Sequence, residues 1–492
     1  MALVALVVLV AGCGGTGGSS GREDGNGAPV ASASDGTPGR SDTEGQSFYV
    51  VVFDAYPDLD RIAAIADRTT RGRALVEELR TTATTSQAEA RRVLREQGVE
   101  FRELWLANAI ALCTCDRDVV DRLRGLDGVR AVIGGADARV DAADDEPVFP
   151  GAAPSASPAL DALGVSALRA RPGAPDGSGV TVGVIDTGVD GAHPALAAGY
   201  RGAPTVAGRA PTHDRNWFDP YSRCRTPCDP QGHGTHVTSV AVGRAVPADP
   251  GSAGSAAGGY RPPAPAVPAV GVAPGATWIA ARGCTGAVCD LDELLAALQF
   301  MVAPTDRDGA DPDPDLRPDV LVNSWGLTSP NPALERAQRA VEASGIIPVA
   351  AAGNHGPACG SVTTPGSHRT TLTVGALGRD RRPLPMSGRG PGPTDSQPNV
   401  AAVGQEVPGA LPDRSWGTMT GTSQAAPQVA GLAALLLQAS PSLRGDFPEV
   451  ERRIDSSATP VPDDSCGLDP GDPRYNNVTG TGLPDALRLL GG

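Results

Sequence analysis

Strongly apolar runs that alternate with helical segments constrain the fold of this 492-residue chain more than any other feature. One such run is VTVGVID at residues 180–186, and another is IIPVAAA at residues 346–352. Runs of this kind suit strands that are covered on both faces, and their alternation with helices is typical of parallel sheets. We therefore predict an α/β fold with a mostly parallel sheet and helices on both of its faces.

Three residues along this pattern have the chemistry of a nucleophilic hydrolase. Asp186 ends the first apolar strand, His233 opens a helix in GHGTHV, and Ser423 enters a helix of small residues in GTSQAAPQVAG. A serine hydroxyl is a weak nucleophile at neutral pH, so a neutral imidazole must take its proton while a carboxylate holds the imidazolium. We predict these roles for Ser423, His233 and Asp186, at the carboxyl ends of the strands.

The three motifs, in the order Asp, His, Ser, resemble those of the subtilisin-like serine peptidases, the subtilases. The resemblance covers roughly the last two-thirds of the chain and implies a three-layer subtilisin-like domain over residues 157–492. It also implies a serine endopeptidase that cleaves extended polypeptides through an acyl-enzyme on Ser423. The alternative is a surface binding protein that keeps the fold without turnover.

Two further segments resemble binding elements of this family. By the resemblance, VNSWG is a strand that pairs with the substrate peptide, and IIPVAAAGNHGP places Asn354 as the oxyanion donor beside the Ser423 backbone amide. The implied substrate-binding residues are Ser324, Trp325, Gly326, Ala351, Ala352 and Gly353, with residues 363–366 as a further candidate wall of the first pocket.

The chain also departs from the family pattern. Gln424 and Gln428 stand where the family usually has Met and His, and Val403 stands where it usually has Pro. His236 and His193 match histidines that are structural in the family. A zinc peptidase helix would have a Glu between His233 and His236, and the chain has none there. His355 fits either a pocket wall or a solvated loop.

Residues 46–137 form a smaller predicted module. Its pattern predicts a strand at 47–53, a helix at 73–97, one long strand or a hairpin at 99–115, a helix at 117–126 and a last strand at 128–133. This βαββαβ order is typical of a ferredoxin-like fold. Its position resembles that of the family's inhibitory propeptide, which implies a zymogen cleaved in the linker at residues 138–156. An independent binding domain is the alternative.

The stretches NAIAL and NSWG, at residues 108–112 and 323–326, are similar to those of the bacillopeptidase F-like branch of the family.

The amino terminus predicts export. Residues 2–11 are apolar but shorter than the roughly 20 residues that span a bilayer, so residues 1–13 are interpreted as a signal peptide. The run VAGC resembles a lipoprotein box with Cys13 as the acylated residue, and residues 14–45 would be a flexible linker. The expected location is extracellular or at the cell surface, lipid-anchored to the membrane through Cys13, with soluble secretion as the alternative.

Cysteine spacing agrees with an oxidising compartment. Cys224 with Cys228 and Cys284 with Cys289 are spaced for local disulfides, which leaves Cys359 and Cys466 by elimination once Cys113 and Cys115 are grouped. Neither local pair has the CxxC spacing of a zinc site.

Charge excludes one class of partner. The net charge is −15, and the 41 basic residues are all Arg without a basic cluster, so we predict no binding of nucleic acid. The acidic run DRDGADPDPD at residues 306–315 lacks the EF-hand pattern and is interpreted as a solvated loop. We expect no cofactor in catalysis, with a structural calcium ion left open.

Overall fold

The computed structural model describes residues 47–134, 139–141, 149–155, 157–206, 208–248, 254–256, 259–261, 266–286, 288–328, 330–391, 397–468 and 474–491. Cys13 and the predicted signal and linker segments at residues 1–45 lie outside this part, as do residues 138, 142–148 and 156 of the predicted processing linker.

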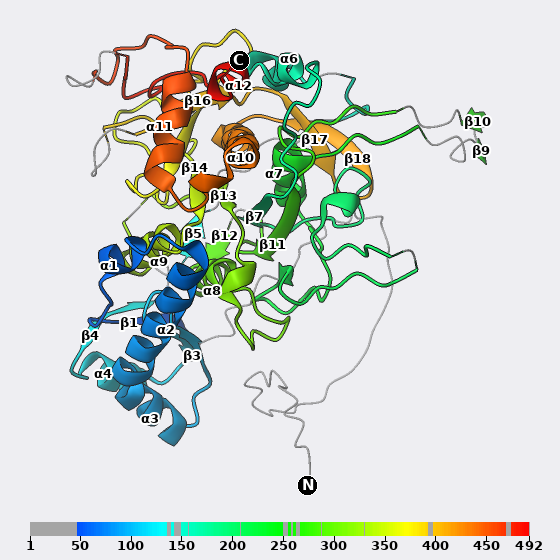
Figure 1. Ribbon diagram of the computed structural model, residues 1–492. Coiled ribbons are helices and arrows are strands. Elements are labelled where there is room, and N and C mark those ends of the chain that lie inside the picture. The colour runs from blue at the N-terminus through cyan, green and yellow to red at the C-terminus, as the bar shows by residue number, and fades with distance from the viewer. Residues whose placement is uncertain are drawn as a thin grey trace, which may run out of the picture. The chain divides into compact units, whose positions relative to one another are not determined.

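A seven-stranded sheet organises the larger part of the chain, and every neighbouring pair of its strands is parallel (Figure 1). In sheet order the strands are β16 (Val400–Val403), β15 (Leu372–Leu377), β14 (Ile347–Ala351), β13 (Val320–Asn323), β7 (Thr181–Asp186), β11 (Thr277–Arg282) and β8 (Trp217–Phe218). The predicted parallel α/β sheet is therefore confirmed.

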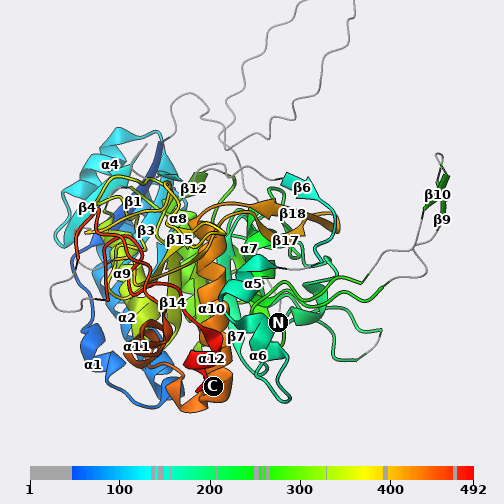
Figure 2. The same ribbon diagram turned by 90° about the horizontal axis from the view of Figure 1, so that it is seen from above.

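Alternation of side chains along the strands explains why helices cover both faces. Val182 and Val184 join one apolar cluster with α7 (His233–Val242) and α10 (Thr422–Ala439). Ile185 and Leu321 join the other with α8 (Leu291–Val302) and α9 (Pro332–Ala343). In Figure 1 α7 and α10 lie above the central strands β7 and β13, α8 and α9 lie below them, and Figure 2 shows the layers from above. The result is the expected three-layer arrangement.

The strand order changes direction at β7. The chain runs from β7 to β8 and β11 on one side, and then returns to the other side of β7 as β13. Open α/β sheets bind ligands beyond the carboxyl ends of the strands at such a switch point. Asp186, at the end of β7, and the residues that follow Asn323, at the end of β13, lie at this switch point.

The amino-terminal module is a four-stranded antiparallel sheet in the order β2-β3-β1-β4. Its elements are β1 (Ser47–Phe53), α1 (Leu59–Ala63), α2 (Arg68–Ser86), α3 (Ala88–Glu96), β2 (Phe101–Leu104), β3 (Ala109–Thr114), α4 (Arg117–Arg124) and β4 (Val129–Gly134). Val51 and Phe53 of β1 pack with α3 and α4. Val50 and Val52, on the opposite face, join the cluster that contains α2, α8 and α9.

The single helix predicted at residues 73–97 is wrong in two respects. It begins at Arg68, where Asp67 accepts the amide of Thr70 at 2.8 Å as a cap, and it breaks at Gln87. The Gln87 side chain is buried and donates to Asn108 Oδ1 at 2.8 Å. The region at 99–115 is a hairpin, the second of the two predicted alternatives.

Smaller elements surround the main sheet. They are β5 (Arg139–Asp141) paired with β12 (Val288–Asp290); β6 (Phe149–Gly151), β18 (Ser415–Met419) and β17 (Val407–Leu411) in one sheet; β9 (Gly254–Ala256) with β10 (Gly259–Arg261); α5 (Pro158–Ala162), α6 (Val165–Arg169), α11 (Phe447–Ser457) and α12 (Ala486–Leu489); and the 3₁₀ turns η2 (Ala197–Gly199), η4 (Pro314–Leu316) and η5 (Pro441–Leu443).

Candidate active site

Asp186 and His233 are joined at the carboxyl edge of the sheet. Asp186 is the last residue of β7 and is buried, while His233 is the first residue of α7. His233 Nδ1 lies 2.7 Å from Asp186 Oδ1, which also accepts the backbone amide of Thr187 at 2.7 Å. A carboxylate on Nδ1 fixes the tautomer whose Nε2 can accept a proton. The pair therefore has the geometry of an oriented general base.

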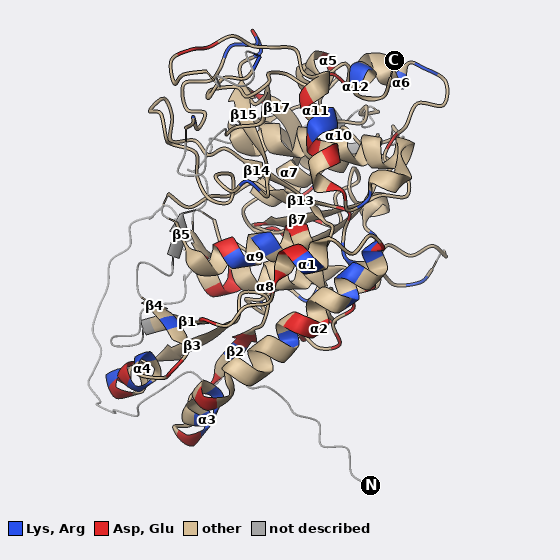
Figure 3. Cartoon of the chain, turned by 60° about the vertical axis from the view of Figure 1, so that its left-hand side comes forward, with Lys and Arg blue, Asp and Glu red and all other residues tan. Residues whose placement is uncertain are grey.

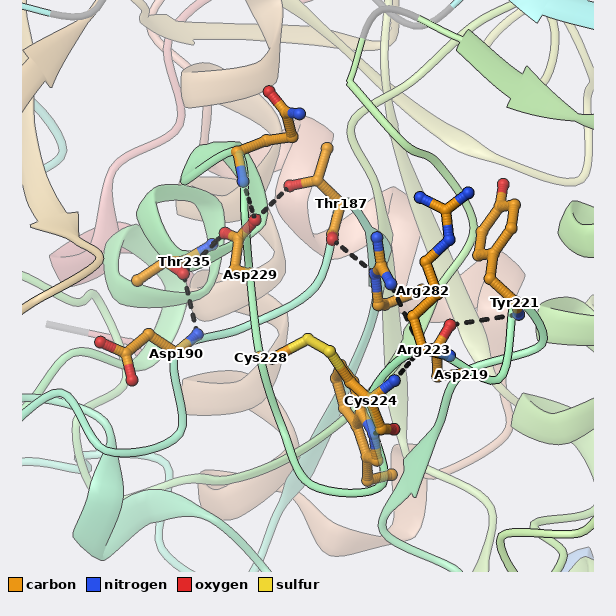
Figure 4. Close-up of a disulfide and its surroundings, with 12 residues drawn as sticks. Thr187, Asp190, Asp219, Tyr221, Arg223, Cys224, Cys228, Asp229, Thr235 and Arg282 are labelled. Atoms are coloured by element: carbon orange, nitrogen blue, oxygen red, sulfur yellow. Dashed lines mark hydrogen bonds and ion pairs between the residues drawn. A yellow bond between two sulfur atoms is a disulfide. The ribbon is translucent and has the colours of Figure 1, made fainter. Parts of the chain in front are cut away.

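A second buried carboxylate, Asp229, holds the two segments of this pair together. Its Oδ1 accepts the Thr187 hydroxyl at 2.9 Å and the amides of Gln231 at 3.1 Å and Gly232 at 2.8 Å. Its Oδ2 accepts the amide of Thr235 at 2.8 Å and the hydroxyl of Thr235 at 2.6 Å. One side chain thus links the residue after Asp186 to the first turn of the helix that carries His233 (Figure 4).

Sequence reasoning missed Asp229. Its signal was an Asp four residues before His233, ahead of a glycine that opens a helix, which is a typical position for capping free amides. The Thr187 hydroxyl completes the link, since it accepts the amide of Gly234 at 3.0 Å while it donates to Asp229.

Ser423 meets the sheet through Ser324. The Ser423 hydroxyl donates to the Ser324 carbonyl at 3.3 Å, and the Ser324 hydroxyl donates to the Ser423 carbonyl at 3.1 Å. Ser324 directly follows β13, and the pairing of Asn323 with Ile185 makes Ser324 level with Asp186 on the neighbouring strand. Neighbouring strands lie about 4.8 Å apart, so Ser423 is anchored next to the Asp186 and His233 pair.

The predicted oxyanion residue lies on the next strand. Asn354 follows β14 by three residues, is buried, and accepts the Thr422 amide at 3.0 Å and the Thr422 hydroxyl at 2.9 Å through Oδ1. Because Thr422 occupies the oxygen, the side-chain nitrogen of Asn354 is the group that can serve as a donor. Thr422 is a second residue that the sequence analysis missed.

The predicted substrate-binding residues lie on two adjacent strand ends. The pairing of Asn323 with Ala350 makes Ser324 level with Ala351, and Trp325, Ala351 and Ala352 are buried. A Cβ at Gly326 would lie 2.2 Å from Thr363 Oγ1, and one at Gly353 would lie 2.5 Å from the same atom. Both glycines therefore border the Thr363 side chain, inside the 363–366 segment that was predicted as a pocket wall.

The other histidines have structural contacts. His236 is fully buried with Nε2 3.0 Å from the Val407 carbonyl, and burial lowers the pKa of His236 to about 3. His193 Nε2 lies 3.1 Å from the Ser415 carbonyl, and its pKa is lowered mainly by burial. His355 is exposed in the loop after Asn354.

The residues that depart from the family pattern contact each other. Gln428 donates through Nε2 to the carbonyl of Val403 at 2.6 Å and to the carbonyl of Gln424 at 2.7 Å. All three side chains are buried. Gln428, which replaces the usual histidine, therefore forms a hydrogen bond with Val403, which replaces the usual proline.

Three disulfides agree with the predicted pairs. They join Cys224 to Cys228, Cys284 to Cys289, and Cys359 to Cys466. Within the described residues Cys115 is in no disulfide.

The Cys224–Cys228 disulfide directly precedes Asp229 in the chain and lies near Asp219 and Arg282 (Figure 4). Asp219 Oδ2 accepts the amide of Cys224 at 2.6 Å and Arg282 Nη1 at 3.2 Å, and Arg282 Nε donates to the Thr187 carbonyl at 3.1 Å. This buried ion pair fixes the loop after Asp186 from the side opposite Asp229.

Arginines pair with most of the acidic run at 306–315. These ion pairs are Arg215 with Asp311 and Asp313, Arg225 with Asp308, and Arg73 with Asp315. In the described ranges no cluster of three or more His, Cys, Asp or Glu is arranged to hold a metal ion.

A parallel sheet that brings an Asp–His pair and a serine at a helix start to one edge defines a subtilisin-like α/β protein. Comparison with protein families agrees. The chain matches the model of the subtilase family, peptidase S8, over residues 177–482, and it belongs to that family.

Several curated proteins resemble the chain. Bacillopeptidase F of Bacillus subtilis (strain 168) is 34% identical over 327 residues, which cover 63% of this chain and 20% of that protein. Serine protease AprX of the same organism is 29% identical over 298 residues, covering 55% and 59%, and subtilisin DY of Bacillus licheniformis is 29% identical over 290 residues, covering 58% and 86%. The chain thus spans about a fifth of bacillopeptidase F, and the predicted bacillopeptidase F-like branch is confirmed.

Among the helices in the described part of the chain, none combines the length and apolar character that crossing a bilayer requires.

Proposed function

We propose that this chain is a serine endopeptidase that acts through Asp186, His233 and Ser423. The observation that carries the proposal is the 2.7 Å bond between His233 Nδ1 and Asp186 Oδ1, at the strand end beside the segment that anchors Ser423. Membership in the subtilase family supports it.

The reaction would proceed through an acyl-enzyme. The Ser423 oxygen attacks the scissile carbonyl carbon while its proton passes to His233 Nε2. The Asn354 side-chain nitrogen and the Ser423 amide donate to the oxyanion. Collapse breaks the C–N bond, and His233 returns the proton to the leaving amine. A water molecule then repeats the sequence at the ester and releases the acid.

An extended polypeptide is the substrate that this edge of the fold would accept. β12 is a short edge strand whose Cys289 and Asp290 pair antiparallel with Val140 and Arg139 of β5. A peptide that adds to such an edge gains backbone hydrogen bonds regardless of its side chains. In this proposal the substrate lies along β12 and the Ser324–Gly326 segment, with its first side chain near Gly326, Gly353 and Thr363.

The amino-terminal module would act as an intramolecular inhibitor, so that the chain is made as a zymogen. Two observations support this proposal. The β1 face that carries Val50 and Val52 is covered by α8 and α9 of the peptidase domain. The chain after the module also enters β5 and occupies the edge of β12, where the substrate would bind.

Export is also part of the proposal. Three disulfides support an oxidising compartment, because such bonds are rare in reducing cytosol. Acylation of Cys13, with soluble secretion as the alternative, rests on the sequence alone. We propose that catalysis requires no cofactor.

Comparing the wild-type chain with Ser423→Ala distinguishes an active peptidase from a protein that only has the fold. Wild type should shed residues 46–137 and label with a serine-directed fluorophosphonate, whereas Ser423→Ala should stay full length and unlabelled. Identical behaviour of the two would contradict the peptidase proposal and favour a binding protein without turnover.

Asn354→Asp tests the oxyanion role separately. The carboxylate can still accept both Thr422 donors but offers none to an oxyanion, so turnover should fall by about 100- to 1,000-fold. The melting temperature of the Ser423→Ala, Asn354→Asp chain should stay close to that of Ser423→Ala. A turnover within threefold of wild type would remove Asn354 from the mechanism.

A further inference from the structure

A second contact between the amino-terminal module and the peptidase domain lies at the opposite edge of the sheet from the site. It involves Arg68 and Arg71, at the start of α2, and Asp319, which immediately precedes β13. Asp319 and Ser324 are five residues apart along an extended strand, which corresponds to roughly 16 Å. This contact, named here the amino-edge contact, is therefore separate from the edge strand β12.

Arg68 reaches the peptidase domain with its whole side chain. Its Nη2 donates to the Pro318 carbonyl at 2.6 Å and lies 3.6 Å from Asp319 Oδ1, and its Nε donates to the Gly345 carbonyl at 3.2 Å. Within the described residues these side-chain contacts all lie between the module and the peptidase domain. Its side chain thus serves the contact between the two parts of the chain.

Arg71 lies one helical turn further on and reaches a different loop. Its Nη1 donates to the Gly445 carbonyl at 2.8 Å, while its Nε donates to the Ile65 carbonyl at 2.7 Å within the module. The side chain is buried, with 8% of its surface exposed. Gly345 and Gly445 both have positive φ, and a Cβ at Gly345 would lie 3.3 Å from Arg71 Nη1. The two loops approach the guanidinium closely because neither has a side chain there.

The peptidase domain completes the contact from its own side. Arg317 is buried and donates to the Ser344 carbonyl at 2.8 Å and to the Arg68 carbonyl. A Cβ at Gly72 would lie 2.4 Å from Arg317 Nη1, so α2 lies directly on this guanidinium. Figures 1 and 3 show α1 and α2 alongside α9, whose end leads to Gly345.

The acceptor groups on the peptidase side of the amino-edge contact suit a partner with several hydrogen-bond donors. This side presents the carbonyls of Pro318, Gly345 and Gly445 and one carboxylate, Asp319, which Arg444 also contacts at 3.4 Å. A planar guanidinium with several donors can satisfy several such acceptors at once. Two arginines at positions i and i+3 of a helix lie on the same face.

We propose that the amino-edge contact is an arginine-binding surface of the peptidase domain, and that its partner is the Arg68 and Arg71 pair of the module. This contact holds the module in place after the linker is cut, so that the module stays bound even when β5 leaves the edge of β12. The proposal deepens the inhibitor role argued above, although the binding itself does not depend on peptidase activity.

The test uses the full chain with Ser423→Ala and a site-specific protease sequence inserted between Ala143 and Asp144. After cutting, size-exclusion chromatography and native mass spectrometry follow how fast the amino-terminal fragment leaves. We expect a retained complex, from which the fragment leaves about ten- to a hundredfold faster with Arg68→Gln, because hydrogen bonds of a charged donor are lost. Arg71→Gln is the second variant and should act in the same direction.

Arg73→Gln is the matched control. Arg73 is on the same helix and also crosses to the peptidase domain, at Asp315, but 65% of its side chain is exposed. Exposed ion pairs contribute little, so its fragment should leave within threefold of the unsubstituted rate. Equal rates for Arg68→Gln and Arg73→Gln would overturn the proposal, and so would immediate loss of the unsubstituted fragment. A wild-type chain that does not label with fluorophosphonate would overturn the peptidase proposal and leave this result unaffected.

Discussion

The Ser324 hydroxyl donates to the carbonyl of Ser423 at 3.1 Å, where α10 has no donor of its own to offer. Pro427 lies four residues after Ser423 inside this helix and has no backbone N–H. The carbonyl of Ser423 would otherwise be buried without a helical partner. Ser324, predicted as a substrate-binding residue, thus also completes the first turn of the helix that presents Ser423.

Ser324→Ala should therefore destabilise the chain by about 1–3 kcal/mol, the cost of an unsatisfied buried carbonyl, and lower turnover. Pro427→Ala restores an N–H at the helical position, so the penalty of Ser324→Ala should shrink in the Pro427→Ala background. A double-mutant cycle on melting temperature and turnover measures this coupling. Strictly additive effects would show that the two residues do not share the carbonyl.

Asp229 should behave as a positioning residue for His233. Asn at this position keeps the size but replaces one accepting oxygen with a donor, which leaves either the Thr187 side or the Thr235 side unpaired. We expect Asp229→Asn to lower kcat at least tenfold with little change in KM, since the substrate contacts stay intact. Asp190→Asn is the control, because the Asp190 carboxylate accepts the amide of the nearby Ala192, two residues along the same loop. A KM effect without a kcat effect would contradict the positioning role.

The site residues that could be predicted are those that stand at the ends of apolar runs in the sequence. Asp186, Ser324 and Ala351 each follow or end an apolar run, and parallel strands bring their carboxyl ends together. The capping of α7 by Asp229 had a local signal, but the bond between Asp229 and Thr187 and the contact of Thr422 with Asn354 were not predictable, because the fold alone brings these partners near. The break at Gln87 was missed for the same reason, since its amide donates to Asn108, which lies in the turn between β2 and β3. The pairing of β5 with β12 joins residues about 150 positions apart without any local signal.

Removal of the disulfide Cys284–Cys289 should affect mainly substrate binding, whereas removal of Cys359–Cys466 should affect mainly stability. The first spans 5 residues and the second 107, so chain entropy assigns them about 2 and about 4.7 kcal/mol respectively. The first also ends at Cys289 of β12, the proposed substrate edge. Replacing Cys284 and Cys289 with Ser should raise KM for extended peptides with a modest drop in melting temperature. Replacing Cys359 and Cys466 should lower the melting temperature more and leave KM unchanged. The reverse assignment of effects would remove β12 from the substrate site.

Two groups, the buried His236 and the half-buried Glu451, should give the folding stability opposite dependences on pH. Burial lowers the pKa of His236 to about 3, so between that value and its ordinary value near 6.5 the unfolded chain binds more protons. The stability from His236 is thus present above about pH 6.5 and is lost as pH falls. Burial raises the pKa of Glu451 from 4.5 to about 7, although Asn399 donates to this carboxyl at 2.7 Å. The stability from Glu451 is therefore present below pH 4.5 and is lost as pH rises through 7.

Glu451→Gln isolates the second effect, because the amide resembles the protonated acid and does not titrate. The melting temperature of Ser423→Ala, Glu451→Gln relative to Ser423→Ala should rise between pH 4.5 and 8, with a slope of at most ~1.4 kcal/mol per pH unit in stability. Glu449→Gln is the control on the same helix. Arg452 and Arg453 lower the Glu449 pKa to about 2, so its substitution should change the pH dependence only below about pH 4.5. A pH-independent difference for Glu451→Gln would show that Glu451 is ionised throughout this range in the folded chain.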